Sequence, residues 1–390
     1  MCSWTVAGRQ LLSLESGDLA YVEARSLSAT ERGMLLLGSP SYVWSRGAQS
    51  GVVVPRDSVV GAVIDSTGSA RAVPAPLPGA EIRGLSAVGN KDGTWSVAFT
   101  VLRPETRFPE DEVAGQLGYG SFDGREWTDL QTEPIPRDVA LNPMRPSPLV
   151  RGEGGGLLWS LPTRARAANA GVAILRRVGS HWRLTTDTPS RVFGLSVAHI
   201  PSWGEVVAIA RADTISSMPR GTLRLESVEL GGGVAEAFRF DPGPGNLWDP
   251  VFDRGQDPRW IGWLSEAADE GLARLEARAA PLYPRDERQK VMVLDSNSAA
   301  LHPLGVLDGG ASYWISHHTG EESQIVLVRT GDVGVERELT MPNPFVGPFG
   351  AVAPGPSRVL LAGPLMGRDE RSPPVTTLMI HLKRTCREAS

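Results

Sequence analysis

The stretch DGTWSVAFT, from Asp92 to Thr100, decides the fold because its pattern returns along the chain. It joins a tight polar turn to a short apolar run, and such runs bounded by Gly or Pro are typical of β-strands. With this stretch the pattern has seven copies, roughly 45–60 residues apart, a spacing typical of repeat folds. The other six are ERGMLLLGS from Glu31, GGGLLWSLP from Gly154, WGEVVAIAR from Trp203, DPRWIGWLS from Asp257, GGASYWISH from Gly309 and PSRVLLAGP from Pro356.

Each copy stands in a similar frame of other apolar segments. A segment such as IRGLSAVG precedes it, a longer strand such as GVAILRRV follows, and a fourth such as ERELTMPN ends the repeat. Seven repeats of four antiparallel strands predict an all-β fold, a seven-bladed β-propeller of four-stranded antiparallel blades. Two β-sandwiches are the competing interpretation, but sandwiches seldom repeat one unit so evenly. We expect a single domain over residues 1–390, with approximate blades 17–78, 79–140, 141–190, 191–244, 245–296, 297–343 and 344–386 plus 2–14.

The last repeat lacks a fourth strand, and the segment CSWTVAGRQLLSL is left over at the front. We expect this segment to pair with the strand at 375–384 and to complete the last blade. Because the two would run antiparallel, Cys2 should face Cys386 within disulfide reach. Two alternatives stay open, a lipid anchor at Cys2 and two free thiols. The disulfide and the lipid anchor both indicate an extracytoplasmic protein (periplasmic, outer-membrane lipoprotein or secreted), whereas a native start at Met1 would make it cytoplasmic.

The segment SFDGREW, from Ser121 to Trp127, carries a family resemblance. It resembles the Asp box of the sialidase and BNR-repeat propellers, Ser-x-Asp-x-Gly-x-x-Trp, with one residue fewer between Asp123 and Gly124. In that family the box is a turn between the third and fourth strands of a blade. The Asp side chain can bond the backbone of its own turn, Gly takes a left-handed conformation and Trp packs between blades. The resemblance therefore implies a structural role.

A second register runs along the first strand of each repeat, where one residue stands just before a Gly, Pro or Ser. If the blades superpose, these residues ring one mouth of the central channel. Three of them are arginines, suited to bidentate capture of a carboxylate, sulfate or phosphate, and sialidases also hold a carboxylate with three arginines. The alternative is a set of solvated or ion-paired channel-lining residues. The candidate ligand-binding residues are Arg25, Arg83, Arg145, Asp249 and His302 with Trp248 as a stacking surface, and Phe193 and Gly347 complete the register.

Connection lengths predict which side of the protein binds. The expected connections between second and third strands are long, whereas those at the opposite strand ends, such as GNKDG and APGPS, are short. Long loops on one face of a rigid scaffold usually carry binding function. We therefore expect this face to recognise a partner protein or a glycan. The long segments begin at Leu102, Leu161, Arg211 and Gly363.

Two clusters raise the question of a metal. SHHTGEES holds His317 and His318 with two glutamates, which suit zinc, but adjacent residues of a strand point to opposite faces and a solvated loop is favoured. The segment from Asp241 to Asp257 holds four aspartates, of which three precede Pro as turn formers. No metal or cofactor is therefore predicted.

Charge and missing motifs narrow the function. The net charge of −5 comes without a basic block, which argues against nucleic acid as a partner, and no apolar stretch is long enough for a transmembrane segment. The G-x-S-x-G, H-E-x-x-H and P-loop motifs are absent, as are the sialidase Arg-Ile-Pro motif and a counterpart of its Tyr nucleophile. The excess of arginine over lysine indicates a high-GC bacterium. We expect a binding or scaffold propeller; the alternatives are a glycan-active enzyme (sialidase-like hydrolase or lyase) using Asp249, Glu81 or His302, and a subunit of a larger assembly.

Overall fold

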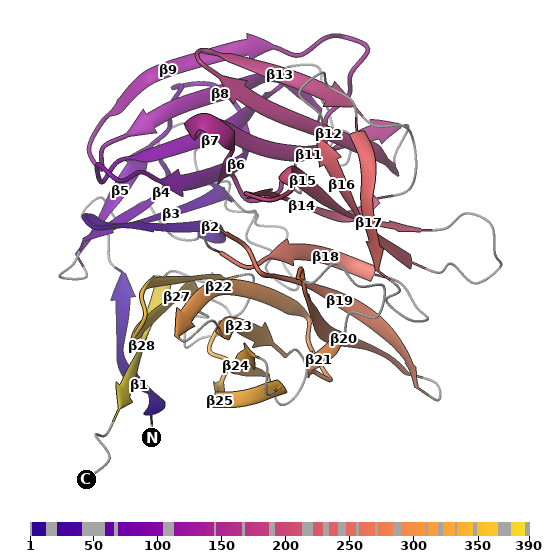
Figure 1. The fold of residues 1–390 in the computed structure, drawn as a ribbon. Helices are drawn as coiled ribbons and strands as arrows, with labels where there is room; N and C mark the ends of the chain where they lie inside the picture. The colour runs from indigo at the N-terminus through magenta and orange to yellow at the C-terminus, as the bar shows by residue number, and fades with distance from the viewer. Residues whose placement is uncertain are drawn as a thin grey trace, which may run out of the picture. The chain divides into compact units, whose positions relative to one another are not determined.

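The computed structural model shows an all-β protein (Figure 1). Within the described residues the strands form seven four-stranded antiparallel sheets, each with its strands in chain order except the one that contains β1. The fold is thus a β-propeller of four-stranded antiparallel blades, as predicted. Described are residues 2–12, 22–40, 59–65, 69–103, 113–143, 146–165, 168–186, 192–212, 221–228, 234–240, 247–254, 257–269, 272–283, 291–308, 311–318, 323–331, 334–345, 349–365 and 376–386.

The chain divides into two compact units, and unit 1 comprises Met1–Ile135 and Pro344–Ser390. Its described strands form three of the seven sheets. The first is β2 (Val22–Thr30), β3 (Gly33–Pro40), β4 (Val59–Asp65) and β5 (Ala70–Pro74); the second is β6 (Ile82–Gly89), β7 (Trp95–Leu102), β8 (Ala114–Phe122) and β9 (Trp127–Pro134); the third is β26 (Gly350–Gly355), β27 (Arg358–Leu365), β28 (Thr376–Cys386) and β1 (Cys2–Leu12).

Unit 2, Pro136–Asn343, holds the other four sheets of the described residues. A 3-10 turn over Glu153–Gly155 lies between β10 and β11. The sheets are β10 (Val150–Arg151), β11 (Leu157–Ala165), β12 (Ala168–Val178) and β13 (His181–Thr186); β14 (Val192–Ile200), β15 (Gly204–Ala212), β16 (Gly221–Val228) and β17 (Val234–Phe240); β18 (Leu247–Phe252), β19 (Trp260–Asp269), β20 (Leu272–Pro281) and β21 (Met292–Asp295); β22 (Ala300–Asp308), β23 (Ala311–His317), β24 (Gln324–Gly331) and β25 (Gly334–Pro342).

The repeated apolar segments are the second strands of the sheets, and they are covered on both faces. Along β7 all but one residue is buried, whereas most of β9, the fourth strand of the same sheet, is exposed. A run that is apolar at every position fits a strand that packs on both sides. The second strands also carry the largest buried rings, and Trp95, Trp159, Trp263 and Trp314 are each no more than 1% exposed.

The core needs a glycine where the Phe99 ring lies. A β-carbon on residue 118 of β8 would fall within the van der Waals radius of this ring, so only glycine fits opposite it. Phe99 belongs to a cluster in unit 1 with Val97 and Phe122. In unit 2 the indole of Trp314 covers Gly262 of the preceding sheet in the same way.

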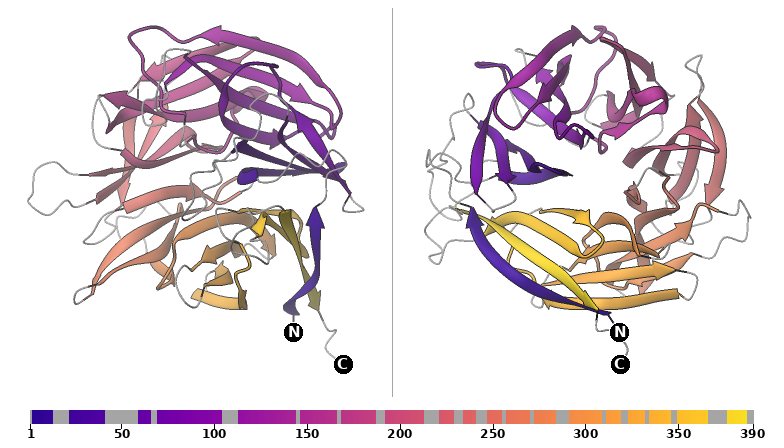
Figure 2. Two further views of the ribbon diagram at one scale, coloured as in Figure 1. Left: turned by 180° about the vertical axis from the view of Figure 1, so that it is seen from behind. Right: turned by 60° about the vertical axis from the view of Figure 1, so that its left-hand side comes forward.

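The first strand of the chain lies beside the last (Figure 2). β1 pairs antiparallel with β28 from Cys2 opposite Cys386 to Leu12 opposite Thr377, and a bulge falls at Ala7. Cys2 and Cys386 are joined by a disulfide with their Cα atoms 4.0 Å apart, which confirms the predicted bridge. A sulfur in this bond cannot also carry a lipid thioether, so the alternative of a lipid anchor at Cys2 is wrong.

One predicted long loop is not a loop. The segment from Leu161 to Gly171 was expected to connect two strands, but β11 continues to Ala165 and β12 begins at Ala168. Pro162 is accommodated inside β11, and its carbonyl oxygen accepts a hydrogen bond from the Asn142 N–H at 2.8 Å. Of the described residues, no helix is long and apolar enough to cross a membrane.

Candidate functional site

The predicted register residues that the structure describes lie near the start of the first strands, where these strands are irregular; Gly347 lies outside the described residues. The pairing of β2 with β3 shifts between Ala24 and Ser26, which makes Arg25 the extra residue, and β18 shifts between Trp248 and Val251. β6 shifts after Arg83, and β22 shifts after Pro303, the residue that follows His302. A β-bulge changes the direction of side chains, and each of these four candidates lies at a bulge or within two residues of one.

Two of these bulges touch each other in unit 2. A β-carbon on Gly194 would come within 2.5 Å of the backbone nitrogen of Asp249, so the backbones of the first strands β14 and β18 pack directly on each other here. Asp249 itself has φ of 42°, in the left-handed region that non-glycine residues seldom adopt. Its side chain is exposed, whereas that of the neighbouring Trp248 is half-buried against a cluster that includes Leu264.

Arg83 is already engaged within its own strand. The residue is 5% exposed, and one guanidinium nitrogen donates to the carbonyl oxygen of Ile82 at 3.0 Å. The other terminal nitrogen forms an ion pair with the Glu81 carboxylate at 3.0 Å. Glu81 thus occupies the place that a bound anion would take.

His302 is held neutral by its surroundings. Its Nε2 is shielded from solvent, and burial lowers the pKa of the ring to about 3, with further lowering by the charges of His317 and Arg254. A neutral imidazole at pH 7 cannot donate a proton as a general acid, although it can accept one. A ring with so low a pKa is also a weak base, so His302 suits a structural role.

The clustering of the three arginines around one site stays a prediction. The Arg25 side chain and the whole of Arg145 lie outside the described residues. Arg83 belongs to unit 1, whereas Trp248, Asp249 and His302 belong to unit 2.

The SFDGREW turn has the geometry expected from its residues. It joins β8 to β9, the third and fourth strands of their sheet. Asp123 Oδ1 accepts the N–H groups of Arg125 at 2.7 Å and Glu126 at 2.8 Å, and these bonds lower the pKa of Asp123. Gly124 has φ of 96°. The Trp127 indole donates to the carbonyl oxygen of Pro74 in the neighbouring sheet at 2.8 Å, so this turn ties two sheets together.

The histidine pair is not the solvated loop that the sequence favoured. His318 pairs with Asp295, whose side chain is fully buried, and Asp295 also accepts from Arg337 at 3.2 Å. Nε2 of His317 lies 2.7 Å from the Asn343 amide nitrogen. In the part of the chain that the structure describes, no three His, Cys, Asp or Glu side chains gather as metal ligands. The pair thus joins strand ends through hydrogen bonds.

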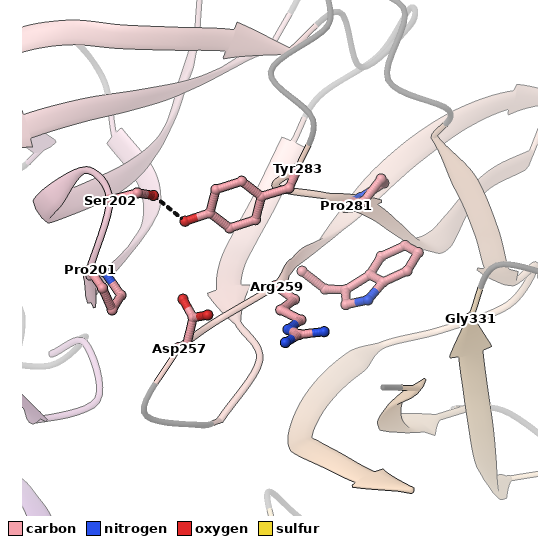
Figure 3. Close-up of a pocket in the computed structure, with 8 residues that line it drawn as sticks. Pro201, Ser202, Asp257, Arg259, Pro281, Tyr283 and Gly331 are labelled. Carbon is pink, nitrogen blue, oxygen red and sulfur yellow. Dashed lines mark hydrogen bonds between the residues drawn. The ribbon is translucent and has the colours of Figure 1, made fainter. Parts of the chain in front are cut away.

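A groove in unit 2 is a concave site lined by described residues (Figure 3). Its volume is about 520 Å³, and it lies among the turn after β14, the turn between β18 and β19, and the ends of β20 and β24. Ser202 and Tyr283 hydroxyls hydrogen bond across it at 2.5 Å. Its lining residues are Pro201, Ser202, Asp257, Arg259, Trp260, Pro281, Tyr283 and Gly331.

A buried carboxylate fixes one wall of the groove. Asp253 is 3% exposed; its Oδ1 accepts the N–H of Arg259 at 2.9 Å and of Trp260 at 3.3 Å, and its Oδ2 accepts the Ser312 hydroxyl at 3.1 Å. Burial raises the pKa of Asp253 to about 6, while these hydrogen bonds lower it and the charge of Asp257 adds to the rise. The turn that carries Asp257 and Arg259 is therefore held at its base.

The sequence analysis missed this groove. It interpreted Asp257 only as a turn former and did not single out Ser202, Arg259 or Tyr283. Ser202 comes from another sheet than Asp257, Arg259 and Tyr283, so no spacing along the chain brings the four together. The one available signal was the turn Asp257–Pro258–Arg259, in which two opposite charges flank a proline.

Comparison with known proteins supports the fold and assigns no family. No protein-family model and no curated protein matches the chain. Among solved structures, a protein of unknown function from Dyadobacter fermentans aligns with a TM-score of 0.52 and 13% identity, over 77% of this chain and 94% of its own. A chain of the mitotic checkpoint complex aligns with a TM-score of 0.53 and 10% identity, over 98% and 94%.

A Hadza microbial sialidase also matches, with a TM-score of 0.48 and 12% identity, over 84% of this chain and 74% of its own. At identities this low the similarity concerns the fold alone, because propellers host unrelated functions. Function must be argued from the residues of this chain.

Proposed function

We propose that the chain is a single seven-bladed propeller over residues 1–390 that acts outside the cytoplasm as a binding or scaffold protein. In this arrangement the seven sheets are the blades, and β1 closes the ring as the fourth strand of the last one. The disulfide supports the location, because disulfides persist in oxidising compartments and are rare in the cytosol. The partner is a protein or a glycan.

The observation that carries the binding proposal is the distribution of connection lengths in unit 1. Residues 41–58, 103–113 and 366–375 connect the second and third strands of its three sheets. At the opposite strand ends, Glu31 and Arg32 suffice between β2 and β3, and Pro356 and Ser357 between β26 and β27. Hairpins need only a few residues, so the longer segments support a surface that recognises a partner.

Substitutions at the two ends of one sheet test the proposal. We expect replacement of Arg107, Phe108 and Glu110 by alanine to abolish binding in a glycan array or to a partner identified in an extracytoplasmic extract. The matched control, Arg125→Ala with Glu126→Ala at the other end of the sheet, should bind as the wild type does. Equal binding by both variants would exclude the long connections as the recognition surface.

The alternative of a glycan-active enzyme is less favoured. It needs an arginine-lined site with free acidic groups, yet Arg83 and Glu81 pair with each other. It also needs a proton donor, and His302 has too low a pKa for that role at neutral pH. Hydrolysis of fluorogenic sialosides or other aryl glycosides by the purified protein, lost on substitution of Asp249, would overturn this preference.

A further inference from the structure

We propose that the groove at Tyr283 binds a small zwitterion, a ligand in which an ammonium and a carboxylate lie close together, as in free amino acids and short peptides. This inference goes beyond the binding function proposed above. That function concerns the connections between second and third strands. The groove is instead lined by turns between first and second strands and by the last residues of third strands.

The groove holds two opposite charges without internal partners. Asp257 and Arg259 are both exposed, and both line it. Among the described residues, neither the Asp257 carboxylate nor the Arg259 guanidinium makes a hydrogen bond or an ion pair. Figure 3 draws both side chains on the turn between β18 and β19, together with the hydrogen bond between Ser202 and Tyr283.

Charge complementarity selects the ligand class. A hydrogen bond between charged groups is roughly twice as strong as one between neutral groups. An anion would satisfy Arg259 and be repelled by Asp257, and a cation would do the reverse. A neutral sugar could bond each side chain through a hydroxyl, but without the attraction between opposite charges. A zwitterion gains this attraction at both side chains, with its ammonium on Asp257 and its carboxylate on Arg259.

The size and walls of the groove indicate the size and polarity of the rest of the ligand. A volume of about 520 Å³ lies in the range of about 300–1,000 Å³ that small-molecule sites occupy. Pro201, Pro281 and the ring of Tyr283, which is 37% exposed, offer apolar surface for a side group. The hydroxyls of Ser202 and Tyr283 are bonded to each other. The ligand therefore combines a zwitterionic head with an apolar side chain.

The groove is preformed. Asp253 fixes the backbone of Arg259 and Trp260, and Trp203 packs against Tyr283 with ring centroids 5.7 Å apart. A site that is rigid before binding loses less conformational entropy when the ligand enters. The nearby indoles of Trp203 and Trp260 also provide a fluorescence signal for binding.

Calorimetry and tryptophan fluorescence with the full chain test the proposal. The probes are L-leucine, L-leucinamide without the carboxylate, N-acetyl-L-leucine without the ammonium, the dipeptide Leu-Gly, and maltotriose as a neutral sugar. We expect leucine or the dipeptide to bind. Each leucine derivative that lacks one of the two charges should bind at least about tenfold more weakly than leucine. Whichever of leucine and Leu-Gly binds more tightly identifies a free amino acid or a peptide as the source.

Two variants test which residue binds the carboxylate of the ligand and which binds its ammonium. Arg259→Gln should remove the preference for leucine over leucinamide, and Asp257→Asn should remove the preference over N-acetyl-leucine. The control is Arg137→Gln with Asp138→Asn, an exposed Arg–Asp pair on another turn of unit 2, which should bind as the wild type. Both substituted sites are exposed, so circular dichroism and unfolding midpoints should match those of the wild type.

Three results would overturn the proposal. One is that no zwitterion binds to the folded wild-type protein at tens of millimolar. Another is that the Asp257 and Arg259 variants bind leucine or Leu-Gly as the control does. The third is that maltotriose binds more tightly than the zwitterions, which would make the groove a sugar site.

Discussion

Units 1 and 2 connect their neighbouring sheets with different chemistry. In unit 1 the connecting side chains bond backbone groups, as when Trp127 donates to the Pro74 carbonyl oxygen or Ser26 Oγ accepts the Ala87 N–H. In unit 2 buried carboxylates connect the sheets. Glu205 of β15 pairs with Arg176 of β12, and Asp253 accepts from Ser312 of β23. Unit 1 also carries the disulfide between its first and last strands.

The difference matters because the two kinds of connection respond to different conditions. Bonds between neutral groups and backbone change little with pH, whereas a buried carboxylate depends on its charge partner. The carboxylates of unit 2 themselves differ, since Glu205 has the Arg176 guanidinium beside it and Asp253 accepts only from N–H and O–H groups. We therefore expect unit 1 to respond to reduction and unit 2 to pH and charge substitution.

The largest effect should come from removing the disulfide. The bond spans a sequence separation of 384, and chain-entropy reasoning gives about 6 kcal/mol for a loop of this length. Cys2→Ser with Cys386→Ser should lower the free energy of unfolding by that amount in urea titration, with hydrogen exchange rising first in β1 and β28. The wild type in reductant is the control and should behave alike. A change below about 1 kcal/mol would show that strand pairing alone holds this sheet.

Breaking the ion pair of unit 2 should have the next largest effect. Glu205→Ala leaves the Arg176 guanidinium, 18% exposed, without its carboxylate and should cost about 3–5 kcal/mol in chemical denaturation. The control is Glu336→Ala, because the Glu336 side chain is 55% exposed in its pair with Arg329 and should contribute less than about 1 kcal/mol. Similar losses in the two variants would contradict the role assigned to burial.

Neutralising Asp253 should not lower the free energy of unfolding at neutral pH, in contrast to the two substitutions above. Its pKa rises from 3.8 to about 6 on folding, so between pH 6 and 4 the folded state binds a proton that the unfolded state does not. The contribution of Asp253 to the free energy of unfolding therefore rises as pH falls through this window. Above it, the ionised form costs on the order of 2–3 kcal/mol relative to the neutral acid.

Asp253→Asn tests this sign, because the amide keeps the oxygen that accepts from Arg259 and Trp260. At pH 8 the variant should be as stable as the wild type or more stable, and the difference should shrink towards pH 4. The measurement is urea unfolding of both proteins from pH 4.5 to 8. If Asp253→Asn destabilised the protein at pH 8 as much as Glu205→Ala does, the ionised form of Asp253 would be the form that stabilises the fold.

The smallest effect should come from the turn of unit 1. Asp123→Ala removes the acceptor of two backbone N–H groups at an exposed site and should cost about 1 kcal/mol in thermal unfolding. The pKa of Asp123 is lowered by these bonds, so their contribution should disappear as pH falls below the ordinary range of Asp. Arg125→Ala on the same turn should change little. A loss as large as that of Glu205→Ala would remove the contrast between the units.

The sequence was sufficient to predict features that follow from residue patterns and from the order of segments along the chain. The copies of the turn-and-strand pattern predicted the second strands because an apolar run between glycines has few other structures available. The left-over segment at the front predicted the pairing of β1 with β28, and hence the Cys2–Cys386 bond. The acceptor geometry of Asp123 also followed from its own turn.

Features that depend on contacts between sheets could not be read from the sequence. Tyr283, Ser202 and Asp257 meet because their sheets pack together, and Asp295 meets His318 for the same reason. Arg83 was a reasonable anion-binding candidate, but the residue pattern alone did not show that its guanidinium pairs with the Glu81 carboxylate. The expected loop at Leu161 was wrong because Pro162 suggests a break, and the bond from Asn142 that accommodates it is a tertiary contact.

The bond between Cys2 and Cys386 also makes the described chain covalently circular. A protease that cuts the backbone once anywhere between these residues releases no fragment, and the protein keeps its mass on a non-reducing gel. Refolding of the nicked protein stays unimolecular, so its yield should not fall on dilution. Reduction would turn the same nicked molecule into two separate chains.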